Sequence, residues 1–415
     1  MARLFLLTIL VSGTVYADDW NQFRGATGSG VIESPLPDSW AMDSGIQWSV
    51  ELPGRANSSP VVTEQRIDVT TQTDDGGLWV LSFDRVKGKK IRETRVGTGE
   101  LKAKGARELW AHRHNAATPT PIATEDSIWA FFGNGLLVRL DPATGDVIWK
   151  KDLEKEHGAY DITFGMGSSP RLVGNHLLVA CMTKGASYLL ALDAKTGQQL
   201  WKANRQYNVA DDHPDSYSSP VIWNRGDSVE VLLSGAGHLD AYGVKDGKRL
   251  WSHPGLSIDS PYGRVIASPV PAGELVIATS PNPSGGGRGR IVAFSTEGEK
   301  WSYERSLPDS STPVVVGDLL FMVSDNGVAS CLETTTGKLV WQNRLGGGPY
   351  HASVIAGDGK VYFQGIDGVC TIMKAGREKE VVARNTLPGT FYATPAAAPG
   401  MLYLRAYERL YAIGN

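Results

Sequence analysis

One stretch of this chain reads Leu190-Ala191-Leu192-Asp193-Ala194-Lys195-Thr196-Gly197-Gln198-Gln199-Leu200-Trp201, and it decides the fold because copies of it recur along the sequence. Close copies end at Trp149 and Trp341, and weaker ones end at Trp251 and Trp301. The pattern predicts a β-hairpin, since an acid can accept hydrogen bonds from the turn N–H groups and the glycine can adopt the positive φ that the turn needs. The residues leading to each tryptophan then form the returning strand.

A second signature precedes each unit: a small residue, mostly followed by proline, and then apolar residues. Eight such starts lie at positions 60, 119, 170, 220, 269, 313, 353 and 395. They are therefore 40 to 59 residues apart, a period typical of four-stranded propeller blades. The 48 glycines and 12 tryptophans also fit many short strands joined by tight turns.

The ends of the chain indicate how the ring closes. A tryptophan is expected on the outer strand of six of the eight units, with Arg92 and Val382 in the other two slots. Trp48 comes before any start, whereas the last unit has no residues left for an outer strand. We therefore predict that residues 46–50 supply that strand and remove the open edge. The predicted fold is an all-β, eight-bladed propeller of four-stranded antiparallel blades, closed by an N-terminal strand.

The first residues predict export. A basic start, an apolar run from Leu4 to Val11 and a small-residue signal before Asp18 are typical of a signal peptide. We expect a signal peptide over 1–17, an extension over 18–45, the propeller over 46–415, and a periplasmic or secreted protein with no lipid anchor and no membrane span. The formal net charge of −3 argues against nucleic acid as a partner.

The repeats resemble the pyrroloquinoline-quinone (PQQ) type of propeller repeat, and they cover nearly the whole chain. The N-terminal Trp20-Asn21-Gln22-Phe23-Arg24-Gly25, together with Leu52-Pro53-Gly54-Arg55, is similar to a subgroup of exported PQQ-like propellers common in planctomycetes. Members of that subgroup are named for their similarity to BamB, the propeller scaffold of outer-membrane barrel assembly. The resemblance implies a fold like that of the quinoprotein alcohol dehydrogenases.

The resemblance implies two functions. The favoured one is a non-catalytic binding or scaffold protein, monomeric, which engages envelope protein segments, a small ligand or a glycan through its loop face without a cofactor. The alternative is a PQQ-dependent or related oxidoreductase that uses the central funnel. Quinoprotein dehydrogenases carry adjacent cysteines, whereas Cys181, Cys331 and Cys370 are far apart in this sequence.

The candidate ligand site is the mouth of the central channel. The loops that lead into the innermost strands, here called the lead-in loops, converge there in a propeller, and ligand sites are commonly built on loops held by a rigid scaffold. The polar and aromatic residues of these loops are the candidates: Arg55, Asn57, His112, His114, Asn115, His213, Tyr217, Tyr262, Arg264, Tyr350, His351 and Tyr392.

Each candidate has a plainer alternative. His112 and His114 could ligate a metal with a third histidine, but solvated loop histidines are the favoured interpretation, and no catalytic or metal-binding residue is assigned. The tyrosines could line a ligand or simply plug the funnel. The basic insertion 85–113 could meet an acidic partner or be a solvated hairpin extension.

Overall fold

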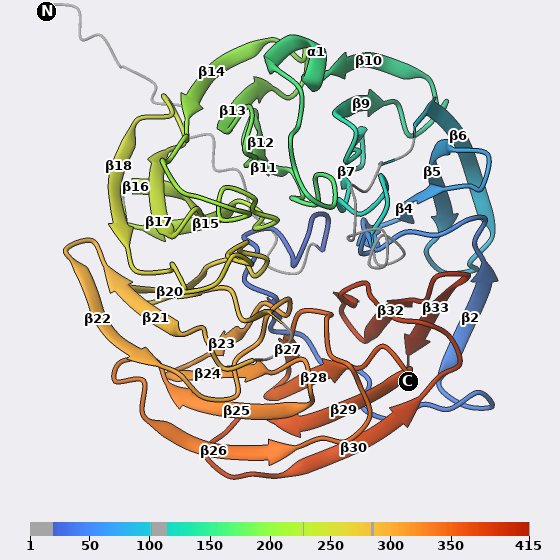
Figure 1. The fold of residues 1–415 in the computed structure, drawn as a ribbon. Coiled ribbons are helices and arrows are strands. Elements are labelled where there is room, and N and C mark those ends of the chain that lie inside the picture. The colour runs from blue at the N-terminus through green and yellow to red at the C-terminus, as the bar shows by residue number, and fades with distance from the viewer. Residues whose placement is uncertain (1–19, 100, 102–113, 227, 284–285, 415) are drawn as a thin grey trace, which may run out of the picture.

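The computed structural model describes residues 20–99, 101, 114–226, 228–283 and 286–414. Within these residues the chain forms eight antiparallel four-stranded sheets arranged as blades around one axis (Figure 1). One blade carries a fifth, parallel strand, and a short helix, α1 (Leu153–His157), follows the outermost strand of blade 2. The expected eight-bladed propeller is confirmed. The predicted signal peptide lies outside the described residues.

Each blade is built outward from the axis. From innermost to outermost strand, blades 1 to 4 are: β3 (Val61–Val62), β4 (Arg66–Gln72), β5 (Gly77–Asp84) and β6 (Lys90–Thr98); β7 (Ile122–Thr124), β8 (Ser127–Phe131), β9 (Leu136–Leu140) and β10 (Val147–Asp152); β11 (Arg171–Val173), β12 (His176–Cys181), β13 (Tyr188–Asp193) and β14 (Gln199–Asn204); β15 (Val221–Arg225), β16 (Ser228–Gly235), β17 (His238–Gly243) and β18 (Arg249–Pro254).

Blades 5 to 8 follow the same order. They are: β19 (Val270–Ala272), β20 (Leu275–Thr279), β21 (Ile291–Ser295) and β22 (Gly298–Tyr303); β23 (Val314–Val316), β24 (Leu319–Val323), β25 (Val328–Glu333) and β26 (Leu339–Arg344); β27 (Ile355–Gly357), β28 (Lys360–Gln364), β29 (Val369–Lys374) and β30 (Val381–Thr386), with β1 (Val31–Ile32) parallel to β27; β31 (Ala396–Ala398), β32 (Met401–Arg405), β33 (Arg409–Gly414) and β2 (Ile46–Glu51).

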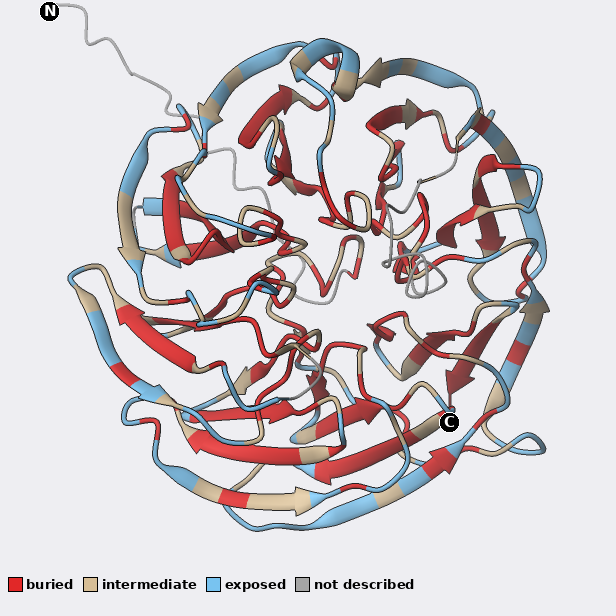
Figure 2. Ribbon diagram, in the orientation of Figure 1, coloured by how far each residue is buried: buried red, intermediate tan, exposed pale blue. Residues whose placement is uncertain are grey.

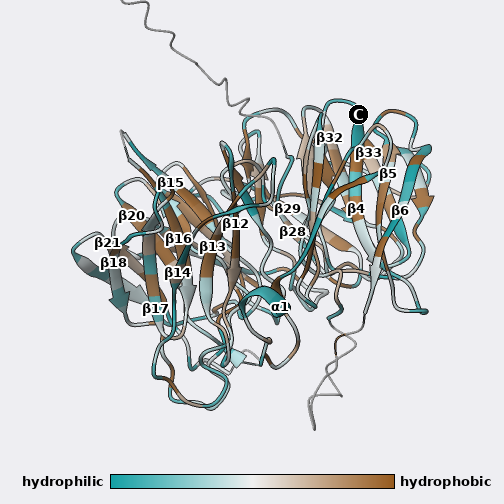
Figure 3. Cartoon of the chain, turned by 90° about the horizontal axis from the view of Figure 1, so that it is seen from above, coloured by the Kyte–Doolittle hydropathy of each residue, from teal (hydrophilic) through white to brown (hydrophobic). Residues whose placement is uncertain are grey.

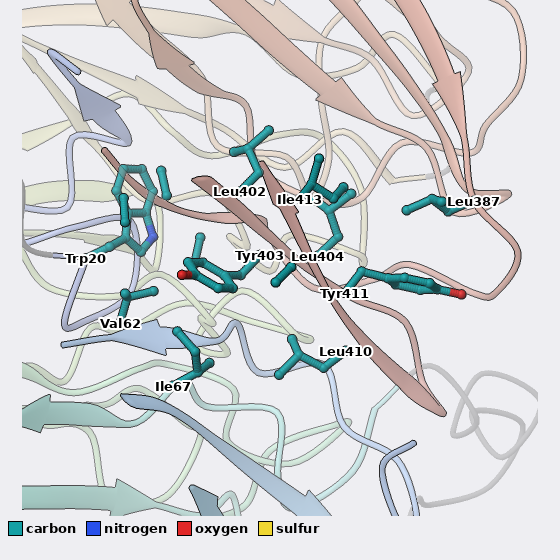
Figure 4. Close-up of a cluster of buried hydrophobic side chains, with 14 of the residues drawn as sticks. Trp20, Val62, Ile67, Leu387, Leu402, Tyr403, Leu404, Leu410, Tyr411 and Ile413 are labelled. Carbon is teal, nitrogen blue, oxygen red and sulfur yellow. The ribbon is translucent and has the colours of Figure 1, made fainter. Parts of the chain in front are cut away.

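The predicted closure is confirmed, because β2 pairs antiparallel with β33 and so completes blade 8. The second and third strands of each blade are mostly buried, whereas the outermost strands are largely exposed (Figure 2). The core of blade 8 contains Leu402, Leu404, Leu410 and Ile413, and it extends to the N-terminal Trp20 (Figure 4). The three cysteines are buried and unpaired.

A ring of hydrogen bonds around the axis ties the blades together. In seven of the eight blades, a serine or threonine just before the innermost strand donates its backbone N–H to the hydroxyl of its counterpart in the next blade. The donor–acceptor pairs are Ser59–Thr120, Thr120–Ser169, Ser169–Ser219, Ser219–Ser268, Ser268–Thr312, Thr312–Ser353 and Ser353–Thr394, at 2.9–3.2 Å. We call this set the hydroxyl ring.

The hydroxyl ring corrects one blade start. The sequence contains two consecutive Thr-Pro pairs, and we placed the start of blade 2 at Pro119. The residue in the ring is Thr120, two positions before β7, because its hydroxyl accepts from Ser59 and its amide donates to Ser169. Thr120-Pro121 is therefore the equivalent of Ser169-Pro170.

The eighth junction, between blades 8 and 1, is held differently. The hydroxyl of Ser59 has no hydrogen-bond partner among the described residues. Instead the buried Arg405 of β32 donates from Nη1 to the hydroxyl of Ser58 and to the carbonyl of Thr70, both at 2.7 Å. Together with β2, this arginine joins the last blade to the first.

The outer tryptophans form a second set of contacts between blades. Trp201 of blade 3 donates from Nε1 to the carbonyl of Val244 in the hairpin turn of blade 4. Gly247 of that turn has φ +67°, and a β-carbon there would lie 2.3 Å from the indole ring. The glycine of the repeat is therefore required twice, by the turn and by the neighbouring tryptophan.

The burial of these tryptophans only partly follows the expectation of largely buried rings. Trp48, Trp301 and Trp341 are buried, whereas Trp149, Trp201 and Trp251 are only half-buried. Five of the six donate from Nε1 to a carbonyl of the next blade's turn, and Trp251 donates to Glu230 instead.

The two slots without tryptophan differ. Arg92 does replace tryptophan, since its guanidinium donates to the carbonyls of Pro142, Ala143 and Thr144 in the next turn. Val382 does not occupy the other slot: Ala383 pairs with Ile372 at the equivalent register position, and Val382 is 39% exposed. A bulge in this strand pair shifts the register by one residue.

Residues 20–32, here called the plug segment, cross the ring on the axis side of the innermost strands (Figure 1). Their carbonyls accept backbone N–H groups from four blades, at Val62, Ala123, Ile222 and Ala356, and Gln22 exchanges two hydrogen bonds with the backbone of Leu172. The segment thus bridges blades that are far apart in sequence.

Two fully buried arginines fix the plug segment. Arg24 donates to the carbonyls of Thr312, Pro313 and Val354, and Arg171 donates to those of Phe23 and Gly25. Burial lowers the pKa of each guanidinium to about 9, so both remain charged at neutral pH. Carbonyl oxygens surround them because a buried cation must be hydrogen-bonded.

Deleting residues 18–50 removes both the plug segment and β2. The remaining chain has an open edge at blade 8 and buried arginine donors without acceptors, so we expect it to lose cooperative unfolding. Urea melts followed by tryptophan fluorescence measure this. A truncated protein that melts like the parent would contradict the closure.

The tryptophan contacts predict a graded loss of stability. Trp341→Ala removes a buried ring and a hydrogen bond to Gly376, and it should cost about 3–5 kcal/mol. Trp201→Ala, at a half-buried ring, should cost about 2 kcal/mol. Denaturant melts measure both values, and a loss below about 1 kcal/mol for Trp341→Ala would show that the ring contributes no packing across the blades.

Candidate functional site

The lead-in loops share their face of the ring with a second set of loops. Because the four strands of a blade alternate in direction, the turn between the second and third strands lies at the same end as the lead-in loop. Helix α1 and the C-terminus accordingly lie at opposite ends of the ring (Figure 3). We call the face formed by both sets the loop face.

An aromatic row crosses one side of the loop face. The ring of His351 stacks on Tyr392 at 5.7 Å between centroids, and Tyr392 stacks on Tyr407 at 5.3 Å, with interplanar angles of 11° and 13°. Arg55 continues the row, with its Cζ 5.9 Å from the centroid of Tyr407. These four residues come from blades 7, 8 and 1, so the ring brings together side chains more than 350 residues apart in sequence.

A charged group lies beside the aromatic row. Arg264 lies between two carboxylates, with Nη1 3.4 Å from Asp212 and Nη2 3.9 Å from Asp309. Asp309 donates its backbone N–H to Asp325, whose other oxygen lies 3.3 Å from Nδ1 of His351 without the alignment of a hydrogen bond. Arg264 is thus largely neutralised by its own neighbours, and Asp325 links this group to the aromatic row.

His114 is an uncharged member of the site. Its Nε2 has no hydrogen-bond partner among the described residues, and its ring meets that of Tyr217 edge-on at 6.2 Å. Burial lowers the pKa of His114 to about 4, so the imidazole is neutral at pH 7. The Tyr217 hydroxyl accepts from the N–H of Phe164, and burial raises its pKa well above the ordinary value.

Other predicted site residues hold the loops in place. Asn115 donates to the carbonyl of Arg55 at 2.7 Å, and Nε2 of His213 donates to the carbonyl of Ser260 at 2.7 Å. Asn57 is half-buried in the loop of Arg55. Tyr262, by contrast, is 54% exposed.

Two of the predicted residues do not contribute a described surface to the mouth. Tyr350 lies in the core of blades 6 and 7, fully buried, and its hydroxyl donates to the carbonyl of Gly346 at 2.6 Å. Its ring faces Gly327 and Gly348, which explains the glycine-rich loop around it. His112 lies outside the described residues, as does most of the basic insertion beyond residue 99.

Sequence reasoning missed Tyr407 and Asp325. Both lie in turns between second and third strands, and we considered only the lead-in loops. The signal was available, since the alternation of strand direction places these turns on the same face. Asp212 and Asp309 were seen in the loops but were not chosen, because sequence does not show that both face Arg264.

Within the described residues, no three histidine, cysteine, aspartate or glutamate side chains come together in a way that could hold a metal ion. None of the described helices is long and apolar enough to span a membrane.

Comparison with known proteins identifies the family. The family model described as outer membrane protein assembly factor BamB matches residues 40–215, 133–329 and 287–379, which together cover most of the chain. The chain belongs to the BamB family. The BamB of Burkholderia pseudomallei (strain K96243) is 26% identical over 256 residues, which cover 58% of this chain and 60% of that protein.

The BamB family is related to quinone-dependent enzymes. A quinohemoprotein alcohol dehydrogenase, ADH IIB of Pseudomonas putida, is 25% identical over 242 residues, 53% of this chain and 33% of the enzyme. The crystal structure of BamB from Moraxella catarrhalis superposes with a TM-score of 0.62 at 13% identity, covering 92% of this chain and all of that one. The predicted family and fold are therefore confirmed.

The buried Asp215, which accepts from the N–H of Thr163, predicts a pH dependence of stability. Burial, with a smaller contribution from Asp212, raises its pKa from 3.8 to about 6. Between these values the folded protein binds more protons than the unfolded chain, so this group makes stability fall as the pH rises from about 4 to 6. Asp215→Asn should remove the effect.

We therefore expect Asp215→Asn to gain about 1–3 kcal/mol relative to the wild type between pH 4 and pH 7. Urea melts of both proteins at the two pH values measure this difference, and any constant cost of the amide cancels. A difference that does not change with pH would mean that Asp215 titrates normally.

Proposed function

We propose that this protein is a non-catalytic scaffold of the bacterial envelope that holds a segment of another protein against its loop face. We further propose that it is exported to the periplasm after removal of residues 1–17, and that residues 46–415 act as one propeller domain. Membership of the BamB family supports a scaffold role, because those relatives are described as outer membrane protein assembly factors.

The observation that carries the proposal is the aromatic row of Arg55, Tyr407, Tyr392 and His351. Tyrosine and arginine are enriched at protein–protein interfaces because they offer large contact area together with hydrogen bonds. The four side chains are pre-stacked, so a partner would pay little entropy to order them. The plug segment makes the opposite end of the ring a closed, structural end.

The residues of the mouth do not fit the alternative, a quinone oxidoreductase. Calcium, which the quinoprotein enzymes use, prefers carboxylates with unneutralised charge. Here Asp212 and Asp309 share Arg264, and Asp325 faces His351 and the N–H of Asp309. The absence of a cofactor remains a prediction for this chain.

A paired set of variants tests the scaffold proposal. Arg55→Ala/Tyr407→Ala removes exposed or half-buried groups of the aromatic row, and Leu200→Ala/Lys202→Ala removes a comparable apolar and cationic pair from the rim strand β14. Both variants should fold. Capture of envelope proteins by immobilised mature protein, quantified by mass spectrometry, should show a partner whose recovery falls at least about tenfold with the first variant only.

Equal recovery by the wild type and by Arg55→Ala/Tyr407→Ala would rule out the aromatic row as the binding surface. Loss with the rim variant alone would move the interface to the edge of the blades.

A further inference from the structure

A hollow of about 590 Å³ opens between the loops of blades 3 and 4, away from the aromatic row. Arg205 and Tyr207 line it at the end of β14, together with Val209 and Pro214 from the following lead-in loop. The exposed Lys184 lies at its edge. The size suits a small ligand or the end of a peptide.

Arg205 is incompletely hydrogen-bonded, although its side chain is fully buried. Its Nη2 donates to the carbonyl of Gly235 at 3.1 Å and lies 2.8 Å from Asp240. Its Nε and Nη1 have no hydrogen-bond partner among the described residues. Asp240 cannot serve them, because its second oxygen already accepts from the hydroxyl of Tyr207 at 2.6 Å.

Other buried arginines show how unusual this is. Arg24 donates to five carbonyls and Arg171 to four. Arg405 also has unpartnered nitrogens, but it lines neither this hollow nor the smaller one beside the plug segment. An unpaired buried donor costs about 1–3 kcal/mol. Arg205 therefore combines unmet donors with adjacent space for an acceptor.

The walls define the acceptor. The ring of Tyr207 is fixed by stacking on His238 at 4.1 Å and by the Cζ of Arg205 at 5.5 Å, so it offers a rigid apolar surface beside Val209 and Pro214. Asp211, also at the hollow, disfavours a highly charged anion. A single negative charge on an apolar body matches these groups.

We propose that this hollow binds a carboxylate carried on an apolar body, either the C-terminal residue of a peptide chain or a small free carboxylic acid. The carboxylate oxygens accept from Arg205 and Lys184, and the apolar body packs between Tyr207, Val209 and Pro214. The site is separate from the aromatic row and does not depend on the scaffold proposal.

Three probes test the site on the full mature chain: the peptide acetyl-Ala-Leu-Phe with a free carboxylate, the same peptide as its C-terminal amide, and 3-phenylpropionate. Calorimetry gives affinities, and the ¹⁵N–¹H resonance of Arg205 Nε reports contact directly. We expect the acid to bind at least about tenfold more tightly than the amide and to shift that resonance. Tighter binding of the peptide acid than of phenylpropionate assigns a chain terminus; equal or weaker binding assigns a free acid.

Three variants locate the binding. Arg205→Lys keeps a cation for Asp240 but removes Nε, and Val209→Trp fills the hollow from a half-buried position that does not disturb the buried ion pair. Each should weaken the acid at least about tenfold. Lys195→Gln, an exposed lysine in the hairpin turn of blade 3, is the matched control and should bind like the wild type.

If Arg205→Lys does not fold, Val209→Trp and the resonance of Arg205 in the wild type decide the question. Equal affinity for acid and amide, no binding up to about 5 mM, or an unmoved Arg205 resonance would overturn the proposal.

Discussion

The hydroxyl ring at the axis is the constraint on which the rest of the structure depends. A single blade is a small sheet that cannot bury both of its faces, so it needs its neighbours. The hydroxyl ring fixes where each neighbour begins, because one backbone N–H and one hydroxyl meet at seven junctions. The outer tryptophans repeat the connection at the rim, where an indole of one blade packs on the turn of the next.

The closing junction shows what the ring requires. The hydroxyl of Ser59 has no partner in the described part of the chain, and Arg405 with β2 joins blades 8 and 1 instead. The plug segment adds a second connection across the axis, through buried Arg24 and Arg171. The last blade is therefore held by the N-terminal residues, and its core reaches Trp20.

The fold was predictable because its signals are local and repeated. An acid, a glycine and a tryptophan at fixed spacing specify a turn, a returning strand and its dock, and eight copies average out single errors. The errors that remain are those of register: two Thr-Pro pairs in succession hid Thr120, and a bulge moved the tryptophan-equivalent position from Val382 to Ala383. Neither can be resolved without knowing which backbone groups pair.

The candidate site was less predictable, for a physical reason. Sequence places residues on loops, but it does not show which side chains turn inward. Tyr350 fills the core between two blades, whereas Tyr407, in a turn that the analysis left aside, joins the aromatic row. Arg205 gave no sequence signal at all, because its unmet donors become visible only once the partners of Asp240 are known.

The central claim is that a rigid hydroxyl ring holds the loop face in one arrangement. Native-state hydrogen exchange of its seven donor amides, from Ser59 to Ser353, tests this most directly. The account predicts that all seven exchange only through global unfolding, with the same free energy as the denaturant melt. Exchange of any of them through a local opening several kcal/mol below that value would contradict the claim, because the blades would then separate while the protein remained folded.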